Sequence, residues 1–204
     1  MQSIENKIES KVKKCGKGKI FFAEDFTTLG TPESIKKALQ RLVKSGFINR
    51  VAHGIYYYPK KDVTIGSLII SDDTPSVDAI ARAIAKRDKA RIVPVGDYAL
   101  NLLGLSTQVP MNVVYITDGA ARRVKIEGST KGILFKHTSE LRNLAYKSKL
   151  LMLIVSALRE IGEGKIRENE LAIIKEHFQK VAKKDFEHDS KLIPLWVRKI
   201  LLTL

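Results

Sequence analysis

The sequence has little of what secreted, membrane or catalytic proteins usually require. Its 204 residues contain a single cysteine, Cys15, which excludes an internal disulfide and favours a reducing compartment. The N-terminus lacks the apolar core of a signal peptide. The apolar run at residues 150–158 is much shorter than the ~20 residues that span a bilayer. We therefore expect a cytoplasmic protein that does not enter a membrane.

Motifs for metal, nucleotide or covalent chemistry are also missing. The four histidines are scattered without ligand spacing, and the sequence has no CxxC, HExxH or glycine-rich phosphate-binding motif. A metal could be bound by Asp72, Asp73 and Asp118. A role in local turns is the better interpretation, because Asp72 and Asp73 lie in a predicted linker and Asp118 lies in a predicted hairpin turn. The sequence thus predicts a protein that is not an enzyme and has no cofactor or metal. The alternative is a nuclease or nucleotidyltransferase, which would require acidic residues that converge on one site.

Acidic residues are few relative to basic ones. The chain has 36 lysines and arginines against 22 aspartates and glutamates, a formal net charge of +14. Residues 1–62 contain 13 basic and 6 acidic residues, residues 63–140 contain 10 and 8, and residues 141–204 contain 13 and 8. Half of the surplus therefore lies in less than a third of the chain. This distribution is typical of a protein that binds nucleic acid or an acidic partner.

The first 70 residues follow the order of a known type of DNA-binding domain. Hydrophobic periodicity and helix caps predict helices over residues 3–14, 23–29 and 33–45. Runs of β-branched and aromatic residues then predict a β-hairpin with strands at residues 47–51 and 54–58. Helix, tight turn, helix and hairpin is the order of a winged helix-turn-helix. We therefore predict a winged-helix DNA-binding domain at residues 1–70.

The helix predicted at residues 33–45 has two distinct faces. At about 100° per residue, its apolar side chains share one arc, and the other arc has long donors with no carboxylate beyond Glu33. A merely solvated helix usually mixes both signs of charge, although an idle basic surface is the alternative. We predict that DNA is contacted by the polar arc and the hairpin, through Ser34, Lys36, Lys37, Gln40, Arg41, Lys44, Arg50, His53 and Tyr56.

These residues are expected to divide between base and phosphate contacts. The N-terminal part of a recognition helix usually meets base edges, which assigns Ser34, Lys37 and either Gln40 or Arg41 to bases. Phosphates are assigned to Lys36, Lys44 and Arg50. The three consecutive tyrosines at residues 56–58 alternate faces, and burial of one or two of them is favoured over stacking on bases.

The rest of the chain, residues 71–204, mixes predicted helices and strands. Helices are expected over residues 76–86, 97–103, 140–161, 168–184 and 194–202, and strands over residues 91–95, 112–117, 122–127 and 132–137. We therefore predict an α+β fold in which the winged helix is followed by helices packed on a small antiparallel sheet. Arg122, Arg123 and Lys125 form a basic patch that could bind nucleic acid or an acidic protein, and a solvated strand edge is an equal alternative.

Several segments resemble one known family. The hairpin strand Gly-Ile-Tyr-Tyr-Tyr-Pro at residues 54–59 is followed by Tyr-Ala-Leu-Asn-Leu-Leu-Gly-Leu-Ser-Thr-Gln-Val-Pro at residues 98–110 and by the strand at residues 113–117. Over roughly residues 5–140, the chain resembles the AbiEi-type antitoxins of bacterial type IV toxin–antitoxin systems and their regulator relatives. The resemblance implies a winged-helix domain that represses its own operon. It also implies a second domain that counteracts a nucleotidyltransferase-type toxin.

Together these features lead to one expected function. We expect a transcriptional repressor that binds a double-stranded DNA operator with inverted repeats and acts as an antitoxin. A regulator without a toxin partner is one alternative. RNA binding by the hairpin and by the Arg122–Arg123 edge is another.

Overall fold

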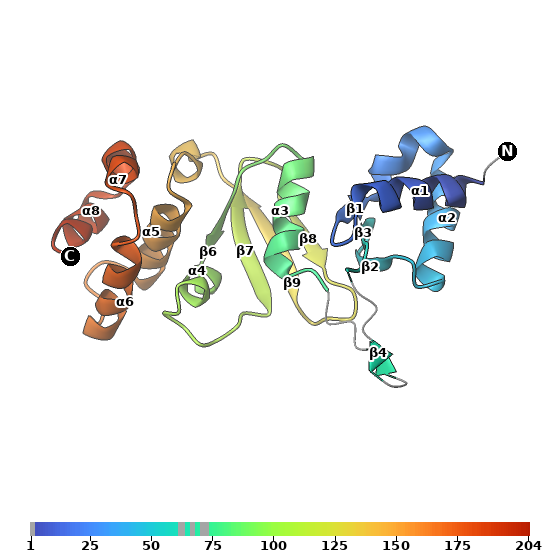
Figure 1. Cartoon of the computed structure of the whole chain (residues 1–204). Coiled ribbons are helices and arrows are strands. Elements are labelled where there is room, and N and C mark those ends of the chain that lie inside the picture. The colour runs from blue at the N-terminus through green and yellow to red at the C-terminus, as the bar shows by residue number, and fades with distance from the viewer. Residues whose placement is uncertain (1–2, 61–63, 66–67, 70–73) are drawn as a thin grey trace. The chain divides into compact units, whose positions relative to one another are not determined.

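The computed structural model describes residues 3–60, 64–65, 68–69 and 74–204, and the fold is α+β as expected (Figure 1). The chain forms two compact units. Residues 1–83 with 124–130 make the first unit, and residues 84–123 with 131–204 make the second. The domain boundary expected after residue 70 lies outside the described residues, as do Asp72 and Asp73.

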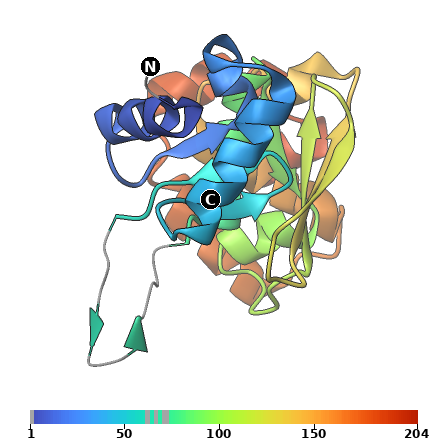
Figure 2. The ribbon, with the colours of Figure 1, turned by 90° about the vertical axis from the view of Figure 1, so that its right-hand side faces the viewer.

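The first unit combines helices with a three-stranded antiparallel sheet. Its elements are α1 (Ile4–Cys15), β1 (Ile20–Phe22), the 3-10 helix η1 (Ala23–Leu29), α2 (Pro32–Lys44), β2 (Asn49–Ala52), β3 (Ile55–Tyr57), β4 (Thr64–Ile65) and β5 (Leu68–Ile69). The strand order is β1-β3-β2, and β4 pairs separately with β5. Figure 2 shows α1, in dark blue, and α2, in lighter blue, running in different directions. The helices and the hairpin lie where the sequence predicts them, and β1 is an additional strand.

The bounds of α2 follow from its local sequence. The hydroxyl of Thr31 accepts the backbone N–H of Ser34 at 3.4 Å, and Pro32 occupies a position where no N–H is needed. The helix stops before Gly46, whose φ of +74° lies in the left-handed region. One face packs into the core of the unit, a cluster that includes Ile8, Val12, Phe26, Ile35, Leu39, Leu42 and Ile48. Each such side chain contributes about 1.5–3 kcal/mol on full burial.

The second unit contains a four-stranded sheet and a group of helices. The elements that follow the first unit are α3 (Val77–Arg87), β6 (Ile92–Val95), α4 (Asp97–Leu102), β7 (Asn112–Thr117), β8 (Arg122–Lys125), β9 (Gly132–His137), the 3-10 helix η2 (Leu141–Leu144), α5 (Lys149–Ile161), α6 (Glu168–Phe178), α7 (Lys183–Asp189), the 3-10 helix η3 (Ser190–Leu192) and α8 (Leu195–Leu202). Two of these elements are divided between the units: α3 begins in the first unit and ends in the second, and β8 begins in the second and ends in the first.

The sheet is mixed, and the antiparallel prediction was wrong for one pair. Its strand order is β6-β7-β9-β8, with β6 and β7 antiparallel but β7 and β9 parallel. The composition of the strands explains this order. The apolar strand β9 places Phe135 against Tyr115, with ring centroids 5.9 Å apart. The charged strand β8 takes the edge, where unpaired backbone and basic side chains meet solvent.

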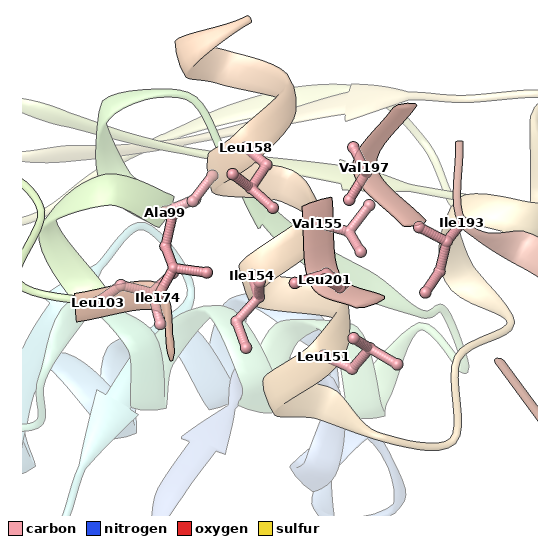
Figure 3. Packing of buried hydrophobic residues seen from close by; sticks show 11 residues of the cluster. Ala99, Leu103, Leu151, Ile154, Val155, Leu158, Ile174, Ile193, Val197 and Leu201 are labelled. Atoms are coloured by element: carbon pink, nitrogen blue, oxygen red, sulfur yellow. The ribbon is translucent and has the colours of Figure 1, made fainter. Parts of the chain in front are cut away.

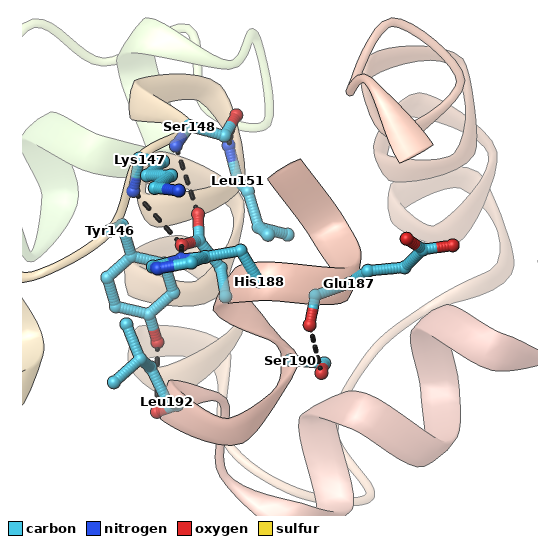
Figure 4. Close-up of polar contacts among 9 residues, drawn as sticks. Tyr146, Lys147, Ser148, Leu151, Glu187, His188, Ser190 and Leu192 are labelled. Carbon is cyan, nitrogen blue, oxygen red and sulfur yellow. Dashed lines mark hydrogen bonds and ion pairs between the residues drawn. The ribbon is translucent and has the colours of Figure 1, made fainter. Parts of the chain in front are cut away.

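The helix predicted over residues 140–161 is interrupted, and α5 begins only at Lys149. The carboxylate of Asp189 accepts the backbone N–H groups of Lys147 and Ser148, each at 3.0 Å, and the Ser148 hydroxyl caps Leu151 N–H at 3.1 Å (Figure 4). These bonds fix an extended entry to α5 in place of a helical turn. Residue 189 is distant in sequence, so local periodicity could not indicate the break.

The helix predicted over residues 168–184 is also two helices, α6 and α7. The break between them lets Phe186 fold back onto Phe178, with ring centroids 5.1 Å apart in an edge-on arrangement. This contact adds apolar burial that a continuous helix would lose. The predicted final helix is confirmed as α8.

Helices α4, α6 and α8 of the second unit pack against α5. Figure 3 shows side chains from α4, α6 and α8 packed against it, and the cluster comprises Ala99, Leu103, Leu151, Ile154, Val155, Ala157, Leu158, Ile174, Ile193, Val197 and Leu201. The residues after position 160 therefore have a structural role, because α6 and α8 complete this core.

Candidate nucleic-acid interface

The exposed face of α2 presents the side chains that the sequence predicts. Lys36, Lys37, Gln40, Arg41 and Lys44 are exposed, and the helix has no acidic side chain after Glu33. Burial of the apolar face fixes the rotation of the helix and therefore directs these side chains outward. The result is a rigid, basic and donor-rich surface.

Ser34 is the member of the predicted set with the least freedom. Its hydroxyl donates to the backbone oxygen of Thr31 at 2.8 Å and accepts from the Thr31 hydroxyl at 3.0 Å. The side chain is therefore engaged in the helix cap, which leaves its hydroxyl less accessible than we expected.

The exposed residues of α2 form two rows. Lys36 and Gln40, four residues apart, line a cavity beside the helix. Lys37, Arg41 and Lys44 continue a second row about 100° further round the helix. Arg41 is near α1, with 3.6 Å between its Nη1 and Oε2 of Glu5. Since Arg41 is 70% exposed, this contact leaves it accessible.

The cavity has a volume of about 520 Å³ and lies between η1, α2 and the β2–β3 hairpin. We call it the α2–hairpin groove. Its apolar lining includes Ile35, Leu39 and Val43. Its polar lining consists of Glu24, Thr27, Lys36, Gln40, Arg50, His53, Tyr56 and Glu127. The groove therefore gathers residues from both segments that were predicted to meet DNA.

The hairpin holds Arg50 and His53 beside the groove. Arg50 pairs with Tyr56 across the strands, a bulge follows before Ala52, and Gly54 closes the turn with φ +71°. His53 is exposed in this turn. The hairpin thus places Arg50 on the strand and His53 at the tip, and both side chains line the groove.

Glu127 is a residue of the groove that the sequence did not indicate. Its Oε2 lies 3.2 Å from Nε of Arg50, and its backbone N–H donates to the Val51 oxygen at 2.9 Å. Both residues belong to the first unit, which includes residues 124–130. An acid 76–77 positions away from Arg50 and Val51 in sequence gives no local signal of such a contact.

Tyr56 does not present its ring for stacking, and its assignment as a DNA contact is corrected. The side chain is 7% exposed and belongs to the hydrophobic core of the unit. Burial raises the pKa of its phenol, while the nearby Arg50 lowers it and Glu127 raises it. Tyr58 packs on the same core, with its ring 5.0 Å from that of Phe47, as the alternation of faces predicts.

The basic patch on β8 is divided by the structure. Arg122 forms an ion pair with Asp88, and its guanidinium lies 5.5 Å from the centroid of the Phe135 ring. Arg122 is therefore engaged within the second unit, and its assignment to a binding patch stays a prediction. Arg123 and Lys125 are exposed on the edge strand.

Asp118, the remaining candidate for a metal site, is engaged in a structural contact. Its carboxylate accepts the Arg91 backbone N–H at 2.7 Å and the Arg91 Nε–H at 2.8 Å. Desolvation would raise the pKa of Asp118, but these Arg91 bonds lower it overall. Among the described residues, no group of three or more His, Cys, Asp or Glu side chains is arranged to hold a metal ion.

The comparison with protein families finds a match over most of the chain. The family described as DUF6088, a family of unknown function, matches residues 7–186. The chain belongs to the DUF6088 family. The match includes α2, the hairpin, and the sheet and most helices of the second unit. No curated protein matches the chain. In the part of the chain that the structure describes, no helix has the length and apolar character needed to cross a membrane.

Proposed function

We propose that this DUF6088 protein is a sequence-specific DNA-binding transcriptional regulator whose first unit is a winged helix-turn-helix. In this proposal η1 and α2 are the two helices of the helix-turn-helix, and β2–β3 is the wing. The order of the elements and the core that packs α1, η1 and α2 together support it. The net charge of +14 supplies the electrostatic attraction that nonspecific DNA association needs.

The observation that carries the proposal is the outer face of α2. This 13-residue helix is about 20 Å long, a length and width that fit the major groove of B-DNA. Beyond its first turn, the exposed side chains are donors without a neighbouring carboxylate on the same helix. Arginine and glutamine can form paired hydrogen bonds with guanine and adenine, respectively. Arg41 and Gln40 therefore have the chemistry for base readout.

The two rows on α2 suggest how the contacts divide. Lys37 and Arg41 project from the outer row toward bases, and Lys44 at its end meets the phosphate backbone. Lys36 lines the groove beside Arg50 and His53. These three side chains together bind the phosphates that flank the recognition helix. The wing thus adds affinity, and α2 adds sequence preference.

Selection from a pool of random double-stranded DNA by the full chain tests the proposal. We expect enrichment of one motif arranged as an inverted repeat, and binding of that duplex in preference to a shuffled duplex of equal composition. The same pool in single-stranded DNA and RNA form is the control. A final pool indistinguishable from the starting one, or stronger selection from RNA, contradicts DNA recognition.

We further propose an antitoxin role for the second unit, on the basis of the resemblance to AbiEi-type antitoxins and one structural observation. Leu102, Val109 and Met111 are 42%, 61% and 63% exposed. The connecting loop is fixed because Asn101 Nδ2 donates to the backbone oxygens of Ser106 and Gln108 at 3.2 and 3.1 Å. Apolar side chains held outward in this way are typical of a protein-binding surface.

Growth rescue from a co-expressed nucleotidyltransferase-type toxin tests the antitoxin role. The full chain should restore growth, and Val109→Ser with Met111→Ser should reduce rescue while leaving operator binding unchanged. Leu195→Ser, at another exposed apolar position of the second unit, is the matched control. If the double variant still rescues growth, but variants that cannot bind the operator do not, the protection arises from transcriptional repression and not from the second unit.

A further inference from the structure

The second unit contains a cavity of about 320 Å³ that is separate from the α2–hairpin groove. Ile116 of β7 and Lys136 of β9 are register partners and therefore share one face of the sheet. That face is opposite to the one on which Tyr115 and Phe135 stack. Residues of α5, including Met152 and Arg159, complete the lining. We call this space the β9–α5 pocket.

The pocket has an apolar floor and a basic rim. Ile116, Met152 and Val155 line the apolar part. Lys136 and Arg159 are exposed basic residues at the rim, and Glu160 is the acidic residue in the lining. Lys136 is exposed, so its ammonium group is accessible to a ligand. The combination suits a small molecule with an apolar body and a negatively charged group.

Hydrogen bonds hold the walls of the pocket in place. Arg159 Nη1 donates to Asn143 Oδ1 at 2.8 Å, and Asn143 Nδ2 donates to Glu140 at 3.1 Å. On another side, the Tyr146 hydroxyl donates to the Leu192 oxygen at 3.1 Å, a bond visible in Figure 4. Burial raises the pKa of Tyr146 to about 12, so its side chain remains a neutral phenol in the wall of the pocket. A site fixed in this way loses little entropy when a ligand enters.

We propose that the β9–α5 pocket binds a small organic anion, with its phosphate or carboxylate between Lys136 and Arg159 and its apolar part against Ile116 and Met152. The volume lies at the lower end of the range for ligand pockets, which restricts the ligand to about the size of a nucleoside monophosphate. The guanidinium of Arg159 provides donors beyond the one used by Asn143, and such donors match the geometry of an oxyanion. The Ser156 hydroxyl donates to the Met152 oxygen at 2.9 Å and keeps its acceptor capacity for a ligand hydroxyl or amine.

Calorimetric titration of the full chain with three probes tests this assignment. The probes are adenosine 5′-monophosphate, phenyl phosphate and inorganic phosphate. We expect at least one of the two organic phosphates to bind, and to bind at least tenfold more tightly than inorganic phosphate, because only the organic probes use the apolar floor. Benzoate, tested in parallel, determines whether a carboxylate can replace the phosphate.

Variants determine whether binding occurs in this pocket. Lys136→Met and Arg159→Met should each weaken the organic probe at least fivefold, and Ser156→Leu should abolish binding by filling the space. Lys175→Met, at an exposed lysine of α6, is the matched control and should bind as the parent does. A thermal melt of each variant separates lost binding from lost folding. The proposal is overturned if no organic probe binds the parent protein. It is also overturned if the parent, Lys136→Met and Ser156→Leu bind the probe equally well.

Discussion

The contact between Arg50 and Glu127 gives a sharp prediction about DNA affinity. The carboxylate of Glu127 is 3.2 Å from the Arg50 guanidinium, where a phosphate oxygen would bind if Arg50 contacts the DNA backbone. DNA must therefore displace Glu127 before Arg50 can act. Glu127→Gln removes the charge and keeps the backbone N–H that donates to Val51. We expect this substitution to strengthen DNA binding.

The size of the effect follows from the exposure of the pair. The Arg50 and Glu127 side chains are 38% and 51% exposed, so solvent screens their attraction. Exposed pairs of this kind are worth about 0–1 kcal/mol, which corresponds to at most about a fivefold decrease in Kd. If Arg50 in the variant contacts one more phosphate, the slope of log Kd against log salt concentration should also increase by about 0.9.

Fluorescence anisotropy with a labelled duplex, repeated at several salt concentrations, measures both quantities. Glu163→Gln removes an exposed carboxylate from the second unit and should change neither quantity. In the Arg50→Ala background, Glu127→Gln should lose most of its effect, because its partner is absent. An unchanged or weaker affinity of the single Glu127→Gln variant would refute the competition between Glu127 and the phosphate.

Four further predictions concern stability and catalysis. Asp189→Asn should lower the free energy of unfolding by about 1–3 kcal/mol, because the amide keeps only one acceptor oxygen, whereas the N–H groups of Lys147 and Ser148 bind separate carboxylate oxygens. Thermal melts measure this, and an unchanged midpoint contradicts it. Desolvation would raise the pKa of Asp189, but hydrogen bonds from Ser148, His188 and Lys147 lower it below 3.8. The contribution of the Asp189 carboxylate to folding stability is therefore complete above that value, and it is lost as the pH falls through the lowered pKa. An acid titration in which the parent and Asp189→Asn lose stability in parallel would oppose this reasoning. Arg122→Met should destabilise the protein by about 1 kcal/mol in urea titrations while DNA affinity stays constant, and weaker DNA binding by a folded variant would return Arg122 to the interface. Incubation with Mg²⁺ or Mn²⁺, nucleoside triphosphates and RNA or DNA should leave every substrate unchanged, and turnover that Asp118→Asn abolishes would identify an enzyme.

Local patterns predicted most of the helices and the exposed face of α2. The cap at Thr31, the apolar arc that includes Leu39 and the stop at Gly46 lie within or next to the helix, so a short sequence window contains them all. The same holds for the hairpin, where Gly54 supplies the turn. Features determined by neighbouring residues could therefore be predicted from the sequence.

Features set by distant residues could not. The start of α5 depends on Asp189, which accepts N–H groups more than 40 positions earlier in the chain. The parallel pairing of β7 with β9 joins two strands that are separated in sequence by β8. Glu127 contacts Arg50 because residues 124–130 belong to the first unit, although about 40 residues of the second unit separate them in sequence from the rest of the first. Local periodicity contains no information about these contacts.

The proposal that α2 reads DNA is tested most directly by equilibrium binding of Arg41→Ala and Lys44→Ala to the selected operator and to a shuffled duplex. A paired base contact is worth ~1–3 kcal/mol of discrimination, whereas a phosphate contact contributes a salt slope near 0.9 without preference for sequence. Arg41→Ala should therefore weaken operator binding more than shuffled binding, and Lys44→Ala should weaken both alike and reduce the salt slope. The Lys175→Ala control should match the parent. If both α2 variants stay within about twofold of the parent on both duplexes at every salt concentration, α2 is not the recognition helix.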